Sequence, residues 1–596
     1  MSLSFIRSWF AKGNHAQWCT AIAFAVTIFV KNVLFYKTCY HSLLFSSLFS
    51  DPIEFVVFYG VKVLPALFLM TIMLLTRRIW WTIVVSCIID IWCVTNILYY
   101  IFFNMFFTWD VLALAGNMDG FWNSLLPYLD MKIWIYPLIT LLYVLLVSVV
   151  HVSPRHNNWL LAVVILCIIG LGDIGMNRYR CQTWYSATSS EAVAWESLKG
   201  ESRFSWYMPL GLYRLHGLFT DNWGTHYVKA QSISSYFIAS IIDYARKYVH
   251  RKPHLTDEDI IQISQYINTY PSNCSPQYNL VFVLVESLES WPLLDTIGGN
   301  VVTPNMNRFI LESNTLYCPF IKSQIKKGGS GDGQMIVNTG LLPILEGAAC
   351  TSYGNNVFPN YAHYYPNSVI INPTPNIWNQ SHTTYSYGYK QLVESKRLHD
   401  IDVIYKLDSI LNDSIYQLFP SCVLAITMDS HSPFVRPGGT KLSFTEDVPT
   451  SIAAYLDCIN YVDSCLGDVF ATLNKDNTIL VITGDHIIFK DFMLAEYATS
   501  ISRMELCIKE EKNFCPLLIY SPNFTSSTVI NDTCYQMDIY PTIMHLIGCE
   551  DYYWKGFGVN LLDSAARHNR PISEQEAYRL SDMMIRSDYF RQYLHK

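Results

Sequence analysis

A series of long apolar stretches within residues 1–176 constrains the fold of this chain more than any other feature. A helix needs about 20 residues to cross the hydrocarbon core of a bilayer, and each stretch is long enough to do so. The composition agrees with a membrane protein, because 51% of the 596 residues are hydrophobic and only 15% are charged. We therefore predict a transmembrane domain with five spans, at residues 18–36, 54–76, 79–104, 133–151 and 158–176.

The segments that connect these stretches predict their orientation. Basic residues lie before the first span, between the second and third, and between the fourth and fifth, at Arg7, Lys12, Arg77, Arg78 and Arg155. Cytoplasmic loops collect Lys and Arg, so we expect a cytoplasmic N-terminus and export of everything after about residue 177. No cleavable signal pattern precedes the spans, which predicts a multi-pass protein of the cell membrane.

Two charged residues, Lys31 and Asp90, lie inside the predicted spans. Intramembrane charge can mark a transport path, but the sequence lacks the repeated, Gly- and Pro-broken helices of transporters. A helix–helix or substrate contact is therefore the favoured interpretation. The net charge of −7 offers no basic field for nucleic acid, which excludes that class of partner.

The 16 Cys residues are spaced irregularly, without the repeated C-x-x-C units of a structural zinc cluster. Eleven of them lie from Cys181 onward, in the part expected to reach an oxidising compartment. An odd number cannot all pair with one another. Cys318 and Cys350 form one candidate disulfide, and the alternative is that they are free buried thiols.

Residues 177–275 are predicted to form a juxtamembrane helical linker. Apolar residues recur at helical spacing over 232–250, which predicts an amphipathic helix. This helix either lies along the bilayer surface or packs on the following domain, and we favour the second. A second helix over 256–268 is predicted by Thr256 and Asp259, which form a variant of the capping box.

Residues 276–596 change to short apolar runs separated by helical stretches, which predicts an α/β domain with a mostly parallel central sheet flanked by helices. Three of the runs, 279–287, 422–431 and 478–486, end in side chains suited to metal or phosphate chemistry. Sites in open parallel sheets form where strands end, so we expect these side chains to meet there. They are Glu286, His431, Asp485 and His486. The carboxylates and one imidazole would suit one divalent ion, Mn²⁺, Mg²⁺ or Zn²⁺.

A glycine-rich segment, KKGGSGDGQMIVNTGLLP at 326–343, places Ser330 between glycines just before a helix predicted from about Gly331. Backbone amides at the start of a helix favour an anionic group, and glycines allow close approach of a substrate. A serine hydroxyl needs a metal or a base nearby to act as a nucleophile. The same composition is also typical of a flexible loop.

These motifs, NLVFVLVES, GGSGDGQ, TMDSHSPF and ITGDH, resemble in sequence and order those of the lipoteichoic acid synthase and phosphoglycerol transferase branch of the sulfatase/alkaline phosphatase superfamily. The expected architecture, five helices and then an exported domain, is also similar. The resemblance implies that Glu286, Ser330, Asp485 and His486 hold the metal. It further implies that Ser330 is the nucleophile and that His431, Trp378 and Gln380 bind the substrate.

By this resemblance the protein would move a phosphorylated head group, phosphoglycerol or phosphoethanolamine, from a membrane phospholipid to an exported glycan or lipid through a phosphoseryl intermediate. Two departures stand out. The family's usual nucleophile is a Thr preceded by Lys, whereas Ser330 follows Gly329. The family's pocket carries His, Asp, Trp and Arg, whereas segment 370–380 keeps Trp378 and replaces the others with Ile371, Pro373 and Gln380. Gln cannot replace the charge of Arg, although nearby lysines could supply it, at Lys322, Lys326 or Lys327.

Two other functions remain open. A phosphodiesterase or other hydrolase would use water as the acceptor, although the C/S-x-P-x-R motif of ordinary sulfatases is absent after Ser330. A catalytically silent membrane-bound binding module would tolerate the altered pocket. Retention of the four expected metal-site residues favours an enzyme.

Overall fold

The structure is a computed structural model and divides near residue 250 into a helical unit and an α/β unit. It describes residues 15–40, 52–76, 79–103, 106–109, 112, 131–150, 159–185, 228, 232–249, 255–269, 274–345, 347–374, 377–394, 398–432, 434–445, 448, 450–487, 514–549 and 552–591.

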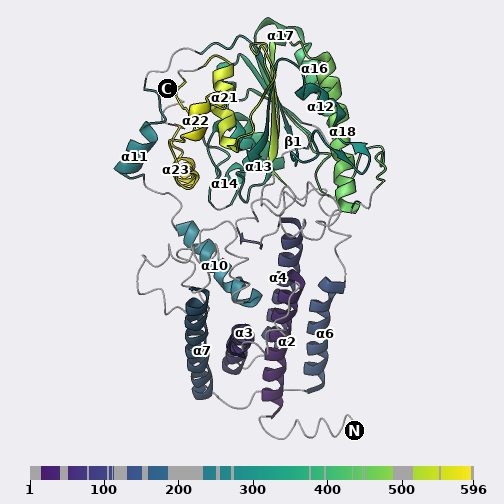
Figure 1. Cartoon of the computed structure of the whole chain (residues 1–596). Helices are drawn as coiled ribbons and strands as arrows, with labels where there is room; N and C mark the ends of the chain where they lie inside the picture. Colours follow the sequence, from purple (N-terminus) through teal and green to yellow (C-terminus); the bar gives the residue numbers. More distant parts are fainter. Residues whose placement is uncertain are drawn as a thin grey trace. The chain divides into compact units, whose positions relative to one another are not determined.

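The helical unit contains a helix at each predicted apolar stretch (Figure 1). They are α2 (His15–Tyr40), α3 (Pro52–Thr76), α4 (Trp80–Phe103), α6 (Met131–Val150) and α7 (Trp159–Tyr185). Among the described residues, three helical segments are long and apolar enough to cross a membrane: Trp18–Tyr40, Phe55–Met73 and Trp80–Ile101. The corresponding apolar segments of α6 and α7 are shorter. Three spans are thus supported, and the count of five stays a prediction.

The charges predicted inside the spans pair with each other. Lys31 Nζ lies 2.6 Å from Asp90 Oδ1. The same ammonium donates to Thr140 Oγ1 at 2.6 Å and to the Ser86 carbonyl at 3.1 Å, and Thr140 Oγ1 donates to Asp90 Oδ2 at 2.5 Å. This geometry is a contact that ties α2, α4 and α6 together, as the favoured interpretation required.

Helix α10 (Ile233–Val249) is the predicted amphipathic helix, but it packs within the helical unit, on α2 and α4. Trp92 Nε1 donates to the Ile233 carbonyl at 3.1 Å, and Ser234 Oγ donates to Asn32 Oδ1 at 2.6 Å. The expectation that it packs on the following domain is therefore wrong. Periodicity identifies an apolar face but not the surface that covers it.

Among its described residues, the α/β unit is built on a central sheet of nine strands. Its main path runs in the order β10-β4-β9-β8-β1-β7-β5-β6, and β11 also pairs with β4. The strands are β1 (Asn279–Val285), β4 (Thr315–Lys322), β5 (Asn367–Asn372), β6 (Gln391–Glu394), β7 (Ser421–Ile426), β8 (Thr478–Gly484), β9 (Cys515–Tyr520), β10 (Thr528–Val529) and β11 (Cys534–Tyr535). The sheet is mixed, because β9 runs antiparallel to both β8 and β4. A strand that is buried on both faces is a continuous apolar run whether it is parallel or antiparallel to its neighbours. The sequence therefore could not predict the direction of β9.

Side chains of β1 alternate between two cores, one on each face of the sheet. Leu280, Phe282 and Leu284 belong to the core that includes residues of α13 (Ser330–Thr339), α21 (Ile539–Leu546) and α23 (Glu574–Ser587). Val281, Val283 and Val285 belong to the core that includes residues of α12 (Pro304–Ile310), α16 (Asp400–Leu411) and α18 (Thr450–Thr472). The domain is thus a three-layer sandwich, with these helices on opposite faces (Figure 1).

Two local predictions are settled by the structure. Thr256 and Asp259 form the predicted capping box at the start of α11 (Asp257–Ser264). Of the two alternatives for Cys318 and Cys350, the structure supports free buried thiols, and the described disulfide joins Cys274 to Cys549. Cys318 is buried in β4, whereas Cys350 lies in α14 (Ala349–Ser352), under the glycine-rich segment.

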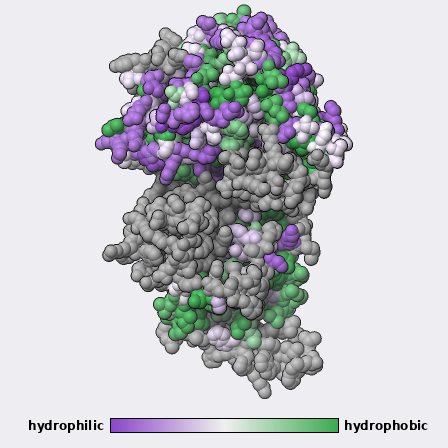
Figure 2. Space-filling model, viewed as in Figure 1, coloured by the Kyte–Doolittle hydropathy of each residue, from purple (hydrophilic) through white to green (hydrophobic). Residues whose placement is uncertain are grey.

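The two units differ in the surface that they expose. On the face shown in Figure 2, the described residues of the helical unit are mostly hydrophobic, whereas hydrophilic residues are much more frequent on the α/β unit. Side chains such as Ile91, Leu142 and Leu171 are more than half exposed in their helices. Such a surface suits lipid rather than water.

Candidate active site

Strand register brings two of the predicted endings together. Strand β1 lies between β8 and β7 and is parallel to both, with Val285 opposite Gly484 and Leu284 opposite Ile426. Glu286 therefore follows β1 at the level where Asp485 and His486 follow β8. The next strand, β7, ends before the segment that carries His431. The sheet therefore brings the endings of β1 and β8 together as predicted, and His431 follows the neighbouring strand without being part of that group.

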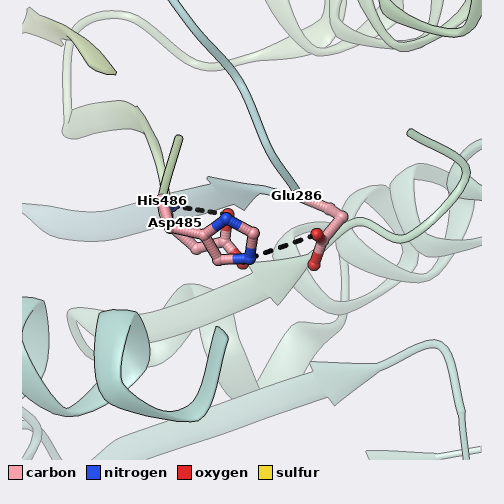
Figure 3. Close-up of side chains that lie close together, drawn as sticks. All are labelled: Glu286, Asp485 and His486. Atoms are coloured by element: carbon pink, nitrogen blue, oxygen red, sulfur yellow. Dashed lines mark hydrogen bonds and ion pairs between the residues drawn. The ribbon is translucent and has the colours of Figure 1, made fainter. Parts of the chain in front are cut away.

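Glu286, Asp485 and His486 turn toward one another (Figure 3). One ligand atom from each lies within 4.8 Å of the others. His486 Nε2 is 3.5 Å from Glu286 Oε1 and 3.6 Å from Asp485 Oδ2. Both carboxylates are buried. Ligand atoms of one ion lie about 2.0–2.2 Å from it, so small side-chain movements would complete a coordination shell.

Hydrogen bonds from neighbouring groups leave one atom of each side chain facing the cluster. Asp485 Oδ1 accepts from the backbone N–H groups of Ser287 and His486, both at 2.7 Å, which leaves Oδ2 for a ligand. His486 Nδ1 lies 3.1 Å from the carbonyl of Ile487. A carbonyl only accepts, so Nδ1 carries the proton and Nε2 keeps a lone pair for a metal.

The charges of the cluster also favour a cation. Burial and the neighbouring charge of Glu286 raise the pKa of Asp485 to about 7. Burial acts to raise the pKa of Glu286, but the imidazoles of His486 and His431 and the hydrogen bond from Ser287 together favour the charged carboxylate and hold that pKa below its ordinary value. The ion pairs described for Glu286 and Asp485 include no lysine or arginine. Burying two carboxylates without such a cation is unfavourable in free energy. A divalent ion between them would remove that cost, so the residues fit a metal.

Ser330 is the first residue of α13, and its hydroxyl reaches the cluster. Its Oγ donates to Glu286 Oε2 at 3.0 Å and lies 3.2 Å from His486 Nε2. Gly329, at the N-cap, has a φ of +53°, a conformation that glycine adopts without strain. At Gly333 a Cβ would lie 2.5 Å from the carbonyl oxygen of Asp485. The glycines therefore let the start of α13 pack directly on the metal-site backbone.

Asp332 was not singled out from the sequence, yet it holds the glycine-rich segment in place. Its Oδ2 accepts from the backbone N–H groups of Lys326 and Gly328, both at 2.9 Å. An acidic residue in the first turn, three positions after the N-cap Gly329, was the signal that could have identified it.

The segment after β7 holds the backbone of Glu286 through two hydrogen bonds. Thr427 Oγ1 accepts from the Glu286 N–H at 3.1 Å, and Ser430 Oγ donates to the Glu286 carbonyl at 2.5 Å. His431 is exposed, and its Nδ1 lies 2.6 Å from the Ser432 carbonyl. Its Nε2 therefore stays available to a substrate.

Asp400 and Asp429 fasten this segment to the start of α16. Asp400 Oδ1 accepts from the N–H groups of Met428 and Asp429, at 2.7 and 3.2 Å. In return Asp429 Oδ2 accepts from the Asp400 N–H at 2.7 Å, and Asp429 Oδ1 lies 3.0 Å from His399 Nδ1. Burial, with the nearby charge of Asp429, raises the pKa of Asp400 to about 8. The sequence pattern gave no sign of this pair, because its members are 29 residues apart.

Trp378 lies against the glycines beside Ser330. A Cβ at Gly331 would be 3.2 Å from Trp378 Cε3, and one at Gly329 would be 3.5 Å from Trp378 Cη2. Trp378 and the next residue, Asn379, both have positive φ, at 53° and 56°. Strain of this kind gathers at ligand sites.

The same segment holds buried polar atoms without a hydrogen-bond partner in the described part of the chain. They are Asn372 Nδ2, Thr374 Oγ1, Trp378 Nε1 and Gln380 Oε1. Buried polar groups are nearly always bonded, so these atoms indicate a polar ligand. Lys322 and Lys326 are engaged with α23, through Glu574 at 2.6 Å and the Tyr578 ring at 4.0 Å. The idea that either lysine supplies the pocket's missing charge gains no support from these contacts.

This fold and cluster define a membrane protein with a sulfatase-like α/β domain, and comparisons with known proteins agree. Residues 5–198 match the lipoteichoic acid synthase N-terminal domain, and residues 351–549 match the sulfatase domain. Lipoteichoic acid synthase 2 of Bacillus subtilis is 22% identical over 304 residues, which are 47% of this chain and 46% of that protein. Lipoteichoic acid synthase of Staphylococcus aureus is 21% identical over 360 residues, 54% of each chain. In both of its parts the chain is thus similar to membrane proteins of the lipoteichoic acid synthase type, which carry a sulfatase domain.

One solved structure resembles most of the chain. Lipooligosaccharide phosphoethanolamine transferase A of Neisseria meningitidis, an integral membrane protein, has a TM-score of 0.50 and 12% identity. The likeness covers 88% of this chain and 95% of that one, and it shows a shared fold. The chain spans about half the length of the curated relatives that it matches. The sulfatase match begins after Glu286 and Ser330, so the part these two residues play rests on their geometry.

Proposed function

We propose that this protein transfers a phosphorylated head group from a membrane phospholipid to an exported glycan or lipid, with Ser330 as the nucleophile. The observation that carries the proposal is the position of Ser330 Oγ, 3.0 Å from Glu286 Oε2 and 3.2 Å from His486 Nε2. A hydroxyl at the start of a helix, beside a metal-type cluster, is placed for attack on a phosphorus atom.

Glu286, Asp485, His486 and Ser330 would hold one divalent ion, Mn²⁺, Mg²⁺ or Zn²⁺. When bound, such an ion lowers the pKa of a coordinated hydroxyl and neutralises charge on phosphate oxygens. Ser287 helps to orient this set, because its Oγ donates to Glu286 Oε1 at 2.6 Å. Asp332 holds the segment that carries Ser330, and the Asp400–Asp429 pair holds the segment that contacts Glu286. Both would help to keep the two side chains in position.

The reaction would proceed in two displacements. In the first, Ser330 Oγ forms a bond to phosphorus, its proton leaves toward Glu286 Oε2, and the bond from phosphorus to the diacylglycerol oxygen breaks. Protonated His431 gives the proton of Nε2 to that leaving oxygen. In the second, the acceptor oxygen forms a bond to phosphorus and gives its proton to His431 Nε2. The bond from phosphorus to Ser330 Oγ breaks, and Ser330 Oγ takes back the proton held by Glu286 Oε2. An acceptor glycan or lipid completes transfer, and water in its place would give hydrolysis.

The segment from Asn372 to Gln380 would bind the transferred head group. Its unpartnered donors and acceptor lie in the segment whose Trp378 ring contacts the glycines beside Ser330. Hydrogen bonds from Asn372, Trp378 and Gln380 would recognise a hydroxyl or amine of phosphoglycerol or phosphoethanolamine without the charge of an Arg.

The proposed membrane arrangement adds two spans to the three that the structure supports. We place five spans in the bilayer, with α6 and α7 as the fourth and fifth, because apolar side chains such as Leu142 and Leu171 are exposed on them. With the N-terminus in the cytoplasm, an odd number of spans puts the catalytic domain outside, where an exported acceptor would be found.

Mass analysis of the full-length protein after incubation with defined phospholipids tests the proposal. We expect an adduct on Ser330 whose mass identifies the head group, and no adduct or transfer in Ser330→Ala. Ser330→Thr keeps a hydroxyl and is the matched control, which should retain activity. Full activity of Ser330→Ala with an unchanged metal content would refute the proposed role. Release of free head group in the presence of acceptor would identify a hydrolase.

A further inference from the structure

A pocket of about 490 Å³ lies at the end of the sheet opposite the catalytic cluster. Asn279 and Thr478, the first residues of β1 and β8, line it, whereas Glu286 and Asp485 follow the last residues of the same strands. Most of the remaining lining comes from α16, from the end of α18 with the loop that follows it, and from the region of α17 (Ser414–Leu418). The α17 region lies beyond this end of the sheet (Figure 1). Seven extended residues separate the two ends by on the order of 20 Å.

The pocket lining combines buried apolar side chains with carboxamides. Ile404, Leu407 and Leu473 are buried apolar side chains of this lining. The carboxamides of the lining are Gln277, Asn279, Asn412, Gln417, Asn474 and Asn477. A large empty volume lined in this way can take a ligand that has both apolar and hydroxyl-bearing surfaces.

Several of these carboxamides have hydrogen-bonding atoms to spare. The side-chain oxygens of Asn279, Asn474 and Asn477 accept from neighbouring groups, at 2.9, 3.2 and 2.9 Å. Within the described part of the chain, the amide nitrogens of these residues make no hydrogen bond. Water held by such amides can be exchanged for the hydroxyl groups of a ligand.

Aromatic and aliphatic side chains stand beside the amides. Tyr416 lines the pocket, and its hydroxyl donates to Gln391 Oε1 at 2.9 Å, which fixes the ring. Leu418 and Phe419 also line it and are 72% and 58% exposed. Exposed apolar residues grouped at the mouth of a pocket are typical of a binding site.

The charges of the lining residues restrict the chemical class of ligand that the pocket can bind. No Lys or Arg is among the lining residues that the structure describes, and Asp408 is the carboxylate there. A phosphate-rich polymer or an anionic lipid head group would therefore meet no cation. A neutral sugar ring matches the site, because its C–H face suits the apolar surface and its hydroxyls suit the amides.

We propose that this pocket binds a neutral sugar unit of the acceptor, at a distance from Ser330. The proposal rests on the proposed function for the identity of the acceptor as an exported glycan. Because the pocket and the cluster lie at opposite ends of the sheet, one sugar cannot occupy both. The pocket would retain an acceptor of several units, while a short acceptor would use the catalytic site alone.

The binding test uses the full-length protein in detergent and saturation-transfer NMR with maltohexaose, cellohexaose and chitohexaose. We expect at least one of these oligosaccharides to bind. The double variant Gln417→Ala/Asn477→Ala should weaken that binding at least tenfold, and Asn355→Ala, an exposed amide outside the pocket, should leave it unchanged. Absence of binding by all three probes, or equal binding to the double variant, overturns the proposal.

A kinetic test separates this inference from the proposed function. In the double variant, KM for a long glycan acceptor should rise at least fivefold while kcat and the rate with a short acceptor stay the same. An equal effect on both acceptors would contradict the inference. Ser330→Ala should bind the oligosaccharide normally, so failure of the catalytic assignment would leave this binding intact, and failure of the pocket would leave turnover of short acceptors intact.

Discussion

The helical unit and the α/β unit each bury a cluster of charged side chains, and the two clusters differ in how their charges are balanced. In the helical unit, Lys31 lies 2.6 Å from Asp90, and Thr140 bridges them. In the α/β unit, Glu286 and Asp485 are two carboxylates beside a single imidazole, His486. The first cluster is complete within the protein, whereas the second has an excess of negative charge. A balanced cluster fastens helices, and an unbalanced one has a place for a cation.

Asp485→Asn should produce the largest effect and the clearest contrast. Transfer activity should be lost, and affinity for the divalent ion should fall more than 100-fold, because an amide lacks the charge of a metal ligand. The metal-free protein should at the same time become more stable, since one of two neighbouring buried charges is gone. Metal titration and thermal unfolding in the presence of a chelator check both parts. A metal-free variant that is less stable than the wild type would contradict the comparison.

Lys31→Met should have the opposite effect on stability. It leaves Asp90 buried without its cation, which is expected to cost about 3–5 kcal/mol. The double variant Lys31→Met/Asp90→Leu replaces the whole pair with apolar groups and should recover most of that loss. Thermal unfolding in detergent measures both variants. A double variant that is as unstable as the single one would contradict the interpretation that the pair only holds the helices together.

Asp400 should make stability depend on pH. Its ordinary pKa is 3.8 and burial beside Asp429 raises it to about 8, so between these values the folded protein binds a proton that the unfolded chain has released. The free energy of unfolding should therefore fall as pH rises through this window, by a few kcal/mol at about 1.4 kcal/mol per pKa unit. Asp400→Asn keeps an acceptor for Met428 and removes the titration. Denaturant unfolding from pH 4 to 8 should show a shallower slope for the variant, and identical slopes would exclude this assignment.

Ser287→Ala should give the smallest effect. Ser287 has a φ of +53° and donates to Glu286 Oε1, so it orients a metal-site carboxylate. Losing this hydrogen bond should lower metal affinity about tenfold, as is typical of groups that orient a ligand. Ser287→Gly, which tolerates the backbone conformation, separates the loss of the hydroxyl from strain. Unchanged metal affinity in both variants would show that Glu286 needs no such support.

Local sequence patterns predicted much of the site because each of its parts belongs to one element. An apolar run followed by Glu286, or by Asp485 and His486, predicts a strand and a side chain at its end. Parallel pairing of β8, β1 and β7 then places those ends together. Thr256 and Asp259 fixed the start of α11 for a similar reason, since a capping box is complete within four residues.

Contacts between distant segments were beyond the reach of such patterns. Asp400 and Asp429 each accept a backbone hydrogen bond from the other's segment, and no local sequence pattern predicts this pairing. Cys318 and Cys350 flank the nucleophile segment in sequence, but Cys274 and Cys549 are the residues that meet. The apolar face of α10 was evident, whereas its partners, α2 and α4, were not.

Sequence patterns alone predict the membrane character of the first part of the chain, the α/β class of the second, and the strand ends and glycine-rich turn that carry the candidate chemistry. Four features become visible only in the folded chain: Lys31 meets Asp90, β9 runs antiparallel, Ser330 Oγ reaches Glu286, and a pocket opens at the opposite end of the sheet. This division arises because periodicity and capping act within a few residues of the chain. The partner of a buried charge, thiol or apolar face is instead selected by packing among segments far apart in sequence.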